Sequence, residues 1–228
     1  LCQIKTSPRV NVKIRNVIFD WSGTLIDDLQ AVWISTNFTI EKCGLPALSL
    51  DQFRSEFCLP FDAFYERVTP GVSLDILEEW YKESFKEEQR SIRPLPHAKV
   101  FFDYCKNHDL KTFLLSTIHP DHYKAQSKTV CFNFDTEYIR VMDKRKKIFQ
   151  ILSENKILPE ETVFIGDMQH DIETAKLGGV GSCAVLTGYN KRNQLEEANP
   201  DFIANDLGHL KESLDLSSLK WPPIDSLS

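Results

Sequence analysis

Short apolar runs that end abruptly at polar residues recur along this chain. The clearest is Val17-Ile18-Phe19, which stops at the carboxylate of Asp20. Runs of this kind are typical of strands that are covered on both faces of a parallel sheet. The expected strands are residues 12–20, 111–116, 137–141, 162–167, 182–186 and 202–204.

Stretches with helical periodicity lie between these strands in the second part of the chain. Alternation of strands and helices predicts right-handed βαβ units and therefore a parallel sheet. Residues 1–12 and the tail Trp221-Pro222-Pro223 carry neither pattern, and we expect both to be irregular. The expected helices are residues 97–108, a helix from about residue 120, residues 144–155, 171–177 and 191–198, and a terminal helix near Leu210.

Residues 28–93 carry helical patterns and interrupt this alternation. A first helix ends at Gly44-Leu45-Pro46, and Ser49-x-x-Gln52 resembles a capping box that opens a second helix. A third helix over residues 74–89 has an apolar stripe at positions 74, 77, 81 and 85, which we expect to pack in a core. We therefore predict a helical domain over residues 28–93, inserted into a core domain of residues 1–27 and 94–228.

The composition narrows the possible partners and the compartment. The net charge is −6 with both signs interspersed, which argues against a nucleic-acid binder. The first residues lack the apolar core of a signal peptide, and no stretch reaches the roughly 18–20 apolar residues of a membrane span. None of the six cysteines forms a Cys-x-x-Cys pair, which disfavours a zinc site and indicates a reducing compartment. We expect a cytoplasmic globular protein with no membrane partner.

Polar residues follow three of the expected strands. Asp20 ends the first strand, Ser116 and Thr117 end the second, and Asp167 follows a later strand with Asp171 four residues beyond it. In an open parallel sheet these strand ends lie at one edge, where ligands bind. Carboxylates from two strands would repel each other there, so we expect a cation between them. Mg²⁺ suits a site of a few carboxylates, a backbone carbonyl and a phosphate oxygen.

A basic run, Lys144-Arg145-Lys146-Lys147, opens the helix between the last two of these strands. Cations at a helix N-terminus oppose the helix dipole by about 0.3–1 kcal/mol each. The run is easier to understand if at least one charge meets an anion. We favour Lys144 for that contact and place Lys147 second.

Together these residues resemble the haloacid dehalogenase-like hydrolase superfamily over residues 15–210. The helical insert looks like the cap domain of the phosphoglycolate phosphatase-like branch. The resemblance implies an α/β fold, a three-layer Rossmann-like parallel sheet core with an inserted α-helical cap. The matching motifs are Asp20-Trp21-Ser22-Gly23-Thr24, Ser116, the Lys144 region and the stretch from Gly166 to Asp171.

The resemblance also implies roles for these residues and an activity. Asp20 would be a nucleophile that forms an aspartyl-phosphate, Ser116 would hydrogen-bond a phosphoryl oxygen, and Lys144 would neutralise the developing charge. Asp167 would hold Mg²⁺ with Asp20 and the backbone carbonyl of Ser22, and Asp171 would hold the metal shell in place. The implied activity is Mg²⁺-dependent hydrolysis of a small phosphorylated metabolite by a monomer or homodimer.

Ser22 departs from the family pattern. Phosphatases of this family usually carry a second aspartate at this position, which protonates the leaving oxygen and later activates water. A serine cannot do so near neutral pH, although its backbone carbonyl can still contact metal. His119 or His170 could supply the proton, because histidine titrates near neutrality.

Further side chains are candidates for contacts with the substrate. Thr117 and His119 are expected at the pocket mouth, and Lys147 is a second possible phosphate contact. In the cap, Arg54 and Arg67 are candidates to hold a substrate anion.

Three alternatives remain open at this point. Haloacid dehalogenases also lack the second aspartate, but they need no metal, whereas Asp167 and Asp171 look like a metal motif. Phosphonoacetaldehyde hydrolases carry the similar Asp-Trp-Ala-Gly-Thr but use a cap lysine, and the comparable stretch Arg54-Ser55-Glu56-Phe57 has none. The third alternative is a regulatory module that binds a phosphorylated ligand with little turnover.

Overall fold

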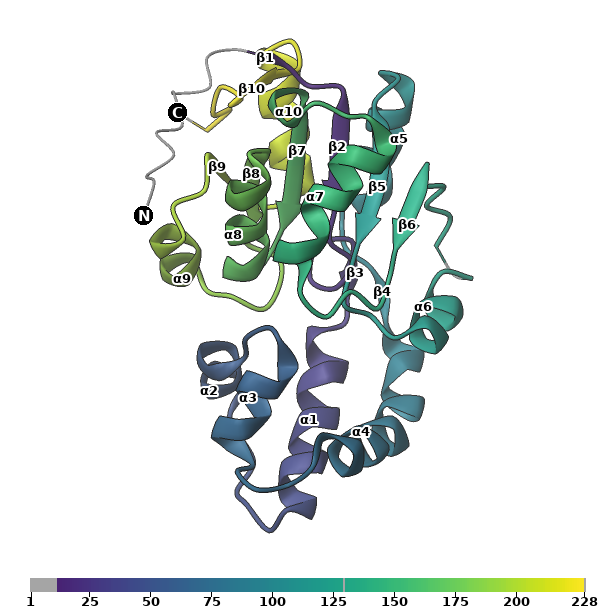
Figure 1. Cartoon of the computed structure of the whole chain (residues 1–228), viewed down its shortest axis with the longest axis vertical. Coiled ribbons are helices and arrows are strands. Elements are labelled where there is room, and N and C mark those ends of the chain that lie inside the picture. The colour runs from purple at the N-terminus through teal and green to yellow at the C-terminus, as the bar shows by residue number, and fades with distance from the viewer. Residues whose placement is uncertain (1–11, 129, 228) are drawn as a thin grey trace.

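A parallel sheet forms the centre of the molecule. The computed structural model describes residues 12–128 and 130–227. Within them, six parallel strands lie in the order β6-β5-β2-β7-β8-β9 (Figure 1). The strands are β2 (Asn16–Phe19), β5 (Lys111–Leu115), β6 (Thr136–Tyr138), β7 (Thr162–Gly166), β8 (Gly181–Val185) and β9 (Phe202–Ala204). The predicted α/β fold is confirmed, and β2 lies at the centre of the sheet with Asp20 directly after it.

Helices cover both faces of this sheet. Val17 and Phe19 of β2 pack with α5 (Ala98–Asn107) and α10 (Leu207–Leu216), whereas Ile18 packs on the opposite face with α7 (Lys144–Asn155) and α8 (Gln169–Gly178). Because successive side chains of a strand point to opposite faces, a strand covered twice must be apolar throughout. Each fully buried large apolar side chain stabilises the fold by about 1.5–3 kcal/mol. The short helices α6 (Pro120–Gln126) and α9 (Arg192–Glu197) complete this part of the molecule.

The helical insert lies beyond one end of the sheet (Figure 1). The chain leaves the core through β3 (Ile26–Asp27) and returns through β4 (Arg93–Pro94), and these two strands pair antiparallel. Between them lie α1 (Leu29–Lys42), α2 (Leu50–Glu56), α3 (Phe61–Val68), α4 (Leu74–Glu88) and a 3₁₀ turn, η1 (Gln89–Ser91).

The sequence predictions for the insert are partly confirmed. The capping box of α2 is present, since Ser49 and Gln52 each accept a hydrogen bond from the other's backbone N–H. Helix α3 was not predicted, because the proline at its start reads as a break. The stripe on α4 is only partly core: Leu77 and Phe85 are buried, but Leu74 is 42% exposed.

Both ends of the described chain differ from the prediction. Residues 12–20 form two strands instead of one, because β1 (Val12–Lys13) pairs antiparallel with β10 (Lys220–Trp221) outside the main sheet. The tail is therefore not wholly irregular, and Trp221 is 1% exposed. Local patterns do not reveal such a pairing between distant segments. The arm predicted over residues 1–12 lies outside the described residues except for Val12. Within the described part, no helix is long and apolar enough to cross a membrane.

Candidate active site

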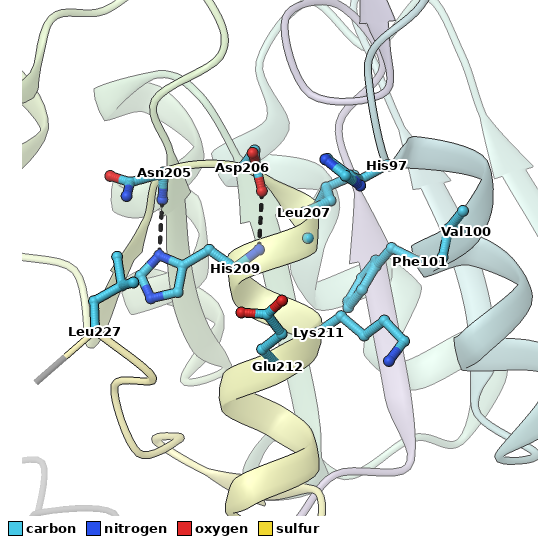
Figure 2. A pocket seen from close by; sticks show the side chains of 11 residues that line it. His97, Val100, Phe101, Asn205, Asp206, Leu207, His209, Lys211, Glu212 and Leu227 are labelled. Atoms are coloured by element: carbon cyan, nitrogen blue, oxygen red, sulfur yellow. Dashed lines mark hydrogen bonds between the residues drawn. The ribbon is translucent and has the colours of Figure 1, made fainter.

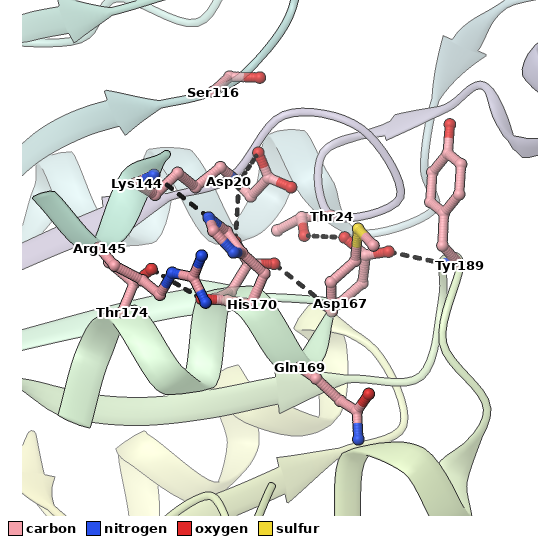
Figure 3. Close-up of polar contacts among 12 residues, drawn as sticks. Asp20, Thr24, Ser116, Lys144, Arg145, Asp167, Gln169, His170, Thr174 and Tyr189 are labelled. Atoms are coloured by element: carbon pink, nitrogen blue, oxygen red, sulfur yellow. Dashed lines mark hydrogen bonds and ion pairs between the residues drawn. The ribbon is translucent and has the colours of Figure 1, made fainter. Parts of the chain in front are cut away.

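Asp20 and Lys144 form a buried ion pair at the carboxyl edge of the sheet (Figure 3). Lys144 is the first residue of α7, and its Nζ lies 2.7 Å from Asp20 Oδ1 and 2.7 Å from Asp171 Oδ1. All three residues are at most 4% exposed. Charges this deep require partners, because an unpaired buried charge is strongly destabilising. The expected contact between the basic run and an anion is therefore made by Lys144.

Asp167 is fixed by hydrogen bonds to both carboxylate oxygens. The Thr24 hydroxyl donates to Oδ1 at 3.1 Å, and the backbone N–H of Tyr189 donates to Oδ2 at 2.7 Å. Gly23 has a φ of 70°, and a Cβ at this position would collide with the Asp167 carboxylate. A glycine is therefore required at Gly23 both by its backbone conformation and by the approach of Asp167.

The carboxylates of Asp20, Asp167 and Asp171 form an acidic cluster in which one oxygen of each lies within 4.8 Å of the others. Burial raises the pKa of Asp20 to about 6 despite the opposing charge of Lys144. Burial together with the charges of Asp20 and Asp171 raises the pKa of Asp167 well above its usual range. Burial opposes the charge on Lys144, but Asp171 and Asp20 outweigh it and raise the pKa of the ammonium group. One ammonium faces three carboxylates, so the residues present fit a divalent cation bound by oxygen ligands.

Ser116, Thr117 and His119 follow β5 at the same edge. Ser116 is buried, and its hydroxyl accepts a hydrogen bond from the Ile118 N–H at 3.2 Å. Thr117 and His119 line the cavity described next. His119 Nδ1 accepts the Asp121 N–H at 3.2 Å, which caps α6.

A cavity of about 530 Å³ lies between this edge and the helical insert, with Asp20 and Ser22 among its lining residues. A second cavity of about 450 Å³ lies between α5 and α10 and is lined by His97, His209 and neighbouring residues (Figure 2). The second cavity contains none of the site residues predicted from the sequence. The acidic cluster reaches the cavity beside the insert through Asp20, while Asp167 and Asp171 lie buried behind it.

Asp28 and Tyr189 also line the cavity between the sheet edge and the insert. The sequence analysis assigned neither of them to the site. The Ser22 hydroxyl donates to the Asp28 carboxylate, and the Tyr189 hydroxyl donates to Asp28 Oδ1 at 3.0 Å. Burial raises the pKa of Asp28 to about 7, although both hydrogen bonds oppose the shift. The sequence could have indicated Tyr189, because this residue follows the apolar run of β8, whose carboxyl end lies at the same edge of the sheet as Asp20.

Residues 17–185 match the family model for haloacid dehalogenase-like hydrolases. The chain belongs to this family. The match spans the acidic cluster, Lys144 and the whole helical insert. The haloacid dehalogenase-like resemblance of the four motifs is thus confirmed, and the chain is a hydrolase of this family.

Named relatives of this hydrolase differ in substrate. Phosphoglycolate phosphatase 1 of Pseudomonas aeruginosa is 35% identical over 232 residues, which cover 94% of this chain and 85% of that protein. Pyrophosphatase PpaX of Oceanobacillus iheyensis is 21% identical over 208 residues, which cover 86% of this chain and 94% of that protein.

The crystal structure of a predicted phosphatase from Clostridium acetobutylicum has the same fold. It superimposes with a TM-score of 0.78 at 17% identity, covering 88% of this chain and 98% of that one.

Other predicted residues of this hydrolase lie away from the cavity. Arg54 donates to the backbone carbonyls of Tyr189 and Asn190, at 2.9 and 3.1 Å. Lys147 donates to Gln150 at 2.8 Å. Neither side chain lines the cavity. Both are occupied by contacts within the protein, so the structure does not bring them to the site.

Arg67 and His170 likewise make contacts within the protein. Arg67 donates to the Ala63 carbonyl at 3.1 Å and pairs with Glu56, outside the cavity lining. His170 is buried, and its Nε2 accepts the backbone N–H of Lys144 at 3.2 Å. His170 therefore helps to place the start of α7, and with it Lys144.

Proposed function

We propose that this chain is a Mg²⁺-dependent phosphohydrolase that acts on a small phosphorylated metabolite through an aspartyl-phosphate on Asp20. The observation that carries the proposal is the position of Asp20. Its carboxylate lies in the lining of the cavity, 2.7 Å from the buried ammonium of Lys144 and within the acidic cluster. A carboxylate held in place beside a fixed cation is suited to attack phosphorus while the phosphoryl charge is neutralised.

The first chemical step forms a bond between an Asp20 carboxylate oxygen and phosphorus. The bond from phosphorus to the alcohol oxygen breaks, and this oxygen takes a proton from water in the cavity, so that the alcohol and a hydroxide ion are formed. Lys144 stabilises the charge on the phosphoryl oxygens, and the Ser116 hydroxyl hydrogen-bonds one of them. In the second step water attacks phosphorus, the bond to Asp20 breaks, and inorganic phosphate leaves. The proton released by this water neutralises the hydroxide formed in the first step.

A divalent cation fits the acidic cluster, and we propose that it is Mg²⁺. Asp20, Asp167 and the backbone carbonyl of Ser22 would hold the ion, while Asp171 orients this set through its contact with Lys144. When bound, Mg²⁺ would neutralise charge on the transferring phosphoryl group. Thr24 and the Tyr189 N–H keep the Asp167 carboxylate aimed into the cluster.

We also propose that residues 28–93 form a cap domain over a core of residues 1–27 and 94–228. Residues of α1, α3 and α4 line the cavity together with residues of the core. Such an arrangement restricts the entry of water to the reacting groups. In this arrangement, side chains of the insert contact the alcohol part of the substrate, whereas the reacting residues belong to the core.

Asp20→Asn tests the proposal because it keeps the size of the side chain and removes the attacking charge. We expect hydrolysis of every ester in a phosphate panel, assayed with Mg²⁺, to fall by at least about 10⁴-fold, the order seen when a nucleophile is lost. The fold should survive, because Asp171 still pairs with Lys144. Asp27→Asn, at an exposed position, is the matched control. Undiminished turnover in Asp20→Asn, or no turnover of any ester by the parent, contradicts the proposal.

A further inference from the structure

Aromatic side chains form much of the wall of the cavity above Asp20. They come from the insert on one side and from the core on the other. Several are only half buried, among them Phe61, Tyr65 and Tyr81, so their rings are open to the cavity. The aromatic lining residues are Phe57, Phe61, Tyr65, Tyr81, Phe85 and Tyr189.

Basic groups that could hold a second anion are scarce in this wall. The basic side chains among the described lining residues are Lys82, His119, His122 and Arg140. Lys82 is paired with Glu78 at 3.3 Å, Arg140 is exposed at the surface, and burial lowers the pKa of His122, which disfavours its charged form. Arg54 and Arg67 are not lining residues, and both donate to backbone carbonyls of the protein. The lining also includes acidic side chains besides Asp20, namely Asp28, Asp62 and Glu78. A substrate carboxylate beyond the phosphate would therefore meet acidic neighbours, and the lysine and arginine of this wall are exposed to solvent, where an ion pair is weak.

The size of the cavity agrees with this chemistry. Its volume of about 530 Å³ is in the range of sites that enclose a whole organic ligand, and such sites are mostly apolar with a few polar groups at one end. Here the polar end is formed by Asp20, Ser22 and Thr117. Lys144 is buried directly behind Asp20. A two-carbon acid bound there would leave the aromatic rings in contact with water. A larger apolar group would cover the rings, and the removal of this apolar surface from water would favour binding.

We propose that this cavity selects phosphomonoesters whose alcohol carries an uncharged aromatic group. The phosphate lies at Asp20, and the aromatic group packs against the half-buried rings of Phe61, Tyr65 and Tyr81. This inference rests on the proposed function for its reaction. It goes beyond the proposed function in naming the class of alcohol and in excluding a carboxylate as the recognised group.

The esters for the test share a primary alcohol as leaving group, so that differences in rate report the cavity. They are 2-phenylethyl phosphate, ethyl phosphate and phosphoglycolate, each assayed with Mg²⁺. We expect kcat/KM for 2-phenylethyl phosphate to exceed that for ethyl phosphate by about 10- to 100-fold, the gain from burying one aromatic ring. Phosphoglycolate should not exceed ethyl phosphate.

Phe61→Ala removes a half-buried ring from the cavity wall. The ratio of kcat/KM between 2-phenylethyl and ethyl phosphate should fall about tenfold in this variant. Phe38→Ala is the matched control, because Phe38 is a half-buried aromatic residue of the same insert that does not line the cavity. It should keep the ratio of the parent. An equal fall in both variants overturns the proposal.

Binding of phosphonate analogues to the parent protein separates this inference from the proposed function. Calorimetry with Mg²⁺ should show that 3-phenylpropylphosphonate binds at least tenfold more tightly than 3-phosphonopropionate. If this preference is found but no ester is hydrolysed, the proposed function fails and the inference stands. If the esters are hydrolysed and phosphoglycolate matches or exceeds 2-phenylethyl phosphate, the inference is overturned and the proposed function stands. Absence of both preference and turnover overturns both.

Discussion

Lys144 is the residue on which the electrostatics of the site depend. Its position at the start of α7 is unfavourable for a cation, by about 0.3–1 kcal/mol. Two ion pairs at 2.7 Å inside the protein outweigh this cost. The same ion pairs also offset the repulsion among the buried carboxylates. Lys144 therefore stabilises the fold in addition to its proposed role in the reaction.

Lys144→Met keeps the length of the side chain and removes its charge. We expect unfolding free energy at pH 7 to fall by about 3–5 kcal/mol, the cost of leaving buried charges unpaired, and turnover to be lost. Urea denaturation and an ester assay measure the two effects. Lys147→Met, in the same helix but outside the site, should change stability by less than about 1 kcal/mol. Equal losses in the two variants would contradict this role of Lys144.

The buried carboxyl of Asp28 makes stability depend on pH. Burial raises its pKa from 3.8 to about 7, so the folded protein holds the proton more tightly than the unfolded chain. The stability that this proton supplies is complete below pH 3.8 and is lost as pH rises through about 7.

Asp28→Asn removes this dependence on pH. Its unfolding free energy relative to the parent should therefore increase with pH, by up to about 4 kcal/mol between pH 4 and pH 9. Denaturation with EDTA across this range measures the difference, and Asp27→Asn controls for the loss of one charge. A difference that does not change with pH would refute the assignment.

The positions of several candidate side chains, though not their roles, could be predicted from the sequence. Asp20, Ser116 and Asp167 could be placed together from the sequence, because each follows an apolar run at one edge of the sheet. The contact of Lys144 with an anion could be predicted because a cation at the start of a helix is unfavourable unless an anion compensates it. Asp28 could not be found in this way, since its place in the cavity depends on Tyr189, which is 161 residues away in the chain.

At the scale of elements, contacts between α2 and the loop after β8 join the insert to the core. Arg54 donates to two carbonyls of this loop, and Lys191 of the loop donates to Ser55 at 3.0 Å. Phe57 stacks on Tyr189, with ring centroids 5.0 Å apart. The loop that carries Tyr189 is thereby held by the insert.

Arg54→Ala removes two hydrogen bonds from a charged donor to this loop. We expect a loss of about 1.5–3 kcal/mol in unfolding free energy, together with faster hydrogen exchange at Tyr189 and Asn190. Arg54→Lys should recover only part of the loss, because an ammonium cannot reproduce the guanidinium fork. Unchanged exchange in Arg54→Ala would show that the loop is held by other contacts.

Most elements could be predicted because their apolar periodicity matches their burial. Helix α7 has the expected bounds, and the strands of the main sheet lie within a few residues of theirs. The failures have a common cause. The pairing of β1 with β10 and the start of α3 directly after Pro60 depend on partners or turns that a local pattern does not show. The stripe on α4 looks like core packing because residues that line an apolar cavity have the same spacing.

At the scale of the whole molecule, the proposed metal site would link stability to metal. A divalent cation bound there would relieve the repulsion among Asp20, Asp167 and Asp171 and would favour the folded state by mass action. The cluster should therefore make the melting temperature depend on the concentration of Mg²⁺.

Mg²⁺ at 100 times its dissociation constant should stabilise the protein by about 2.7 kcal/mol. For a chain of this size we expect the melting temperature to rise by about 5–10 °C. Thermal denaturation with Mg²⁺ and with EDTA measures the shift. Asp167→Asn should abolish it, whereas Asp143→Asn, outside the cluster, should retain it. A shift of the same size in Asp167→Asn would place the ion elsewhere.

The pairing of β3 with β4 has a consequence for how such a protein can change over evolutionary time. Ile26 lies opposite Pro94 and Asp27 opposite Arg93, so the insert leaves and rejoins the core at adjacent points. A segment whose two ends touch can be replaced by another of different length without stretching the sheet. Recombination at this junction would exchange the aromatic side chains of the insert while Asp20, Lys144 and Asp167 stay in place. Under the proposed function, selectivity and reactivity would then be inherited separately, and a lineage would acquire a new substrate without rebuilding the residues proposed to cleave it.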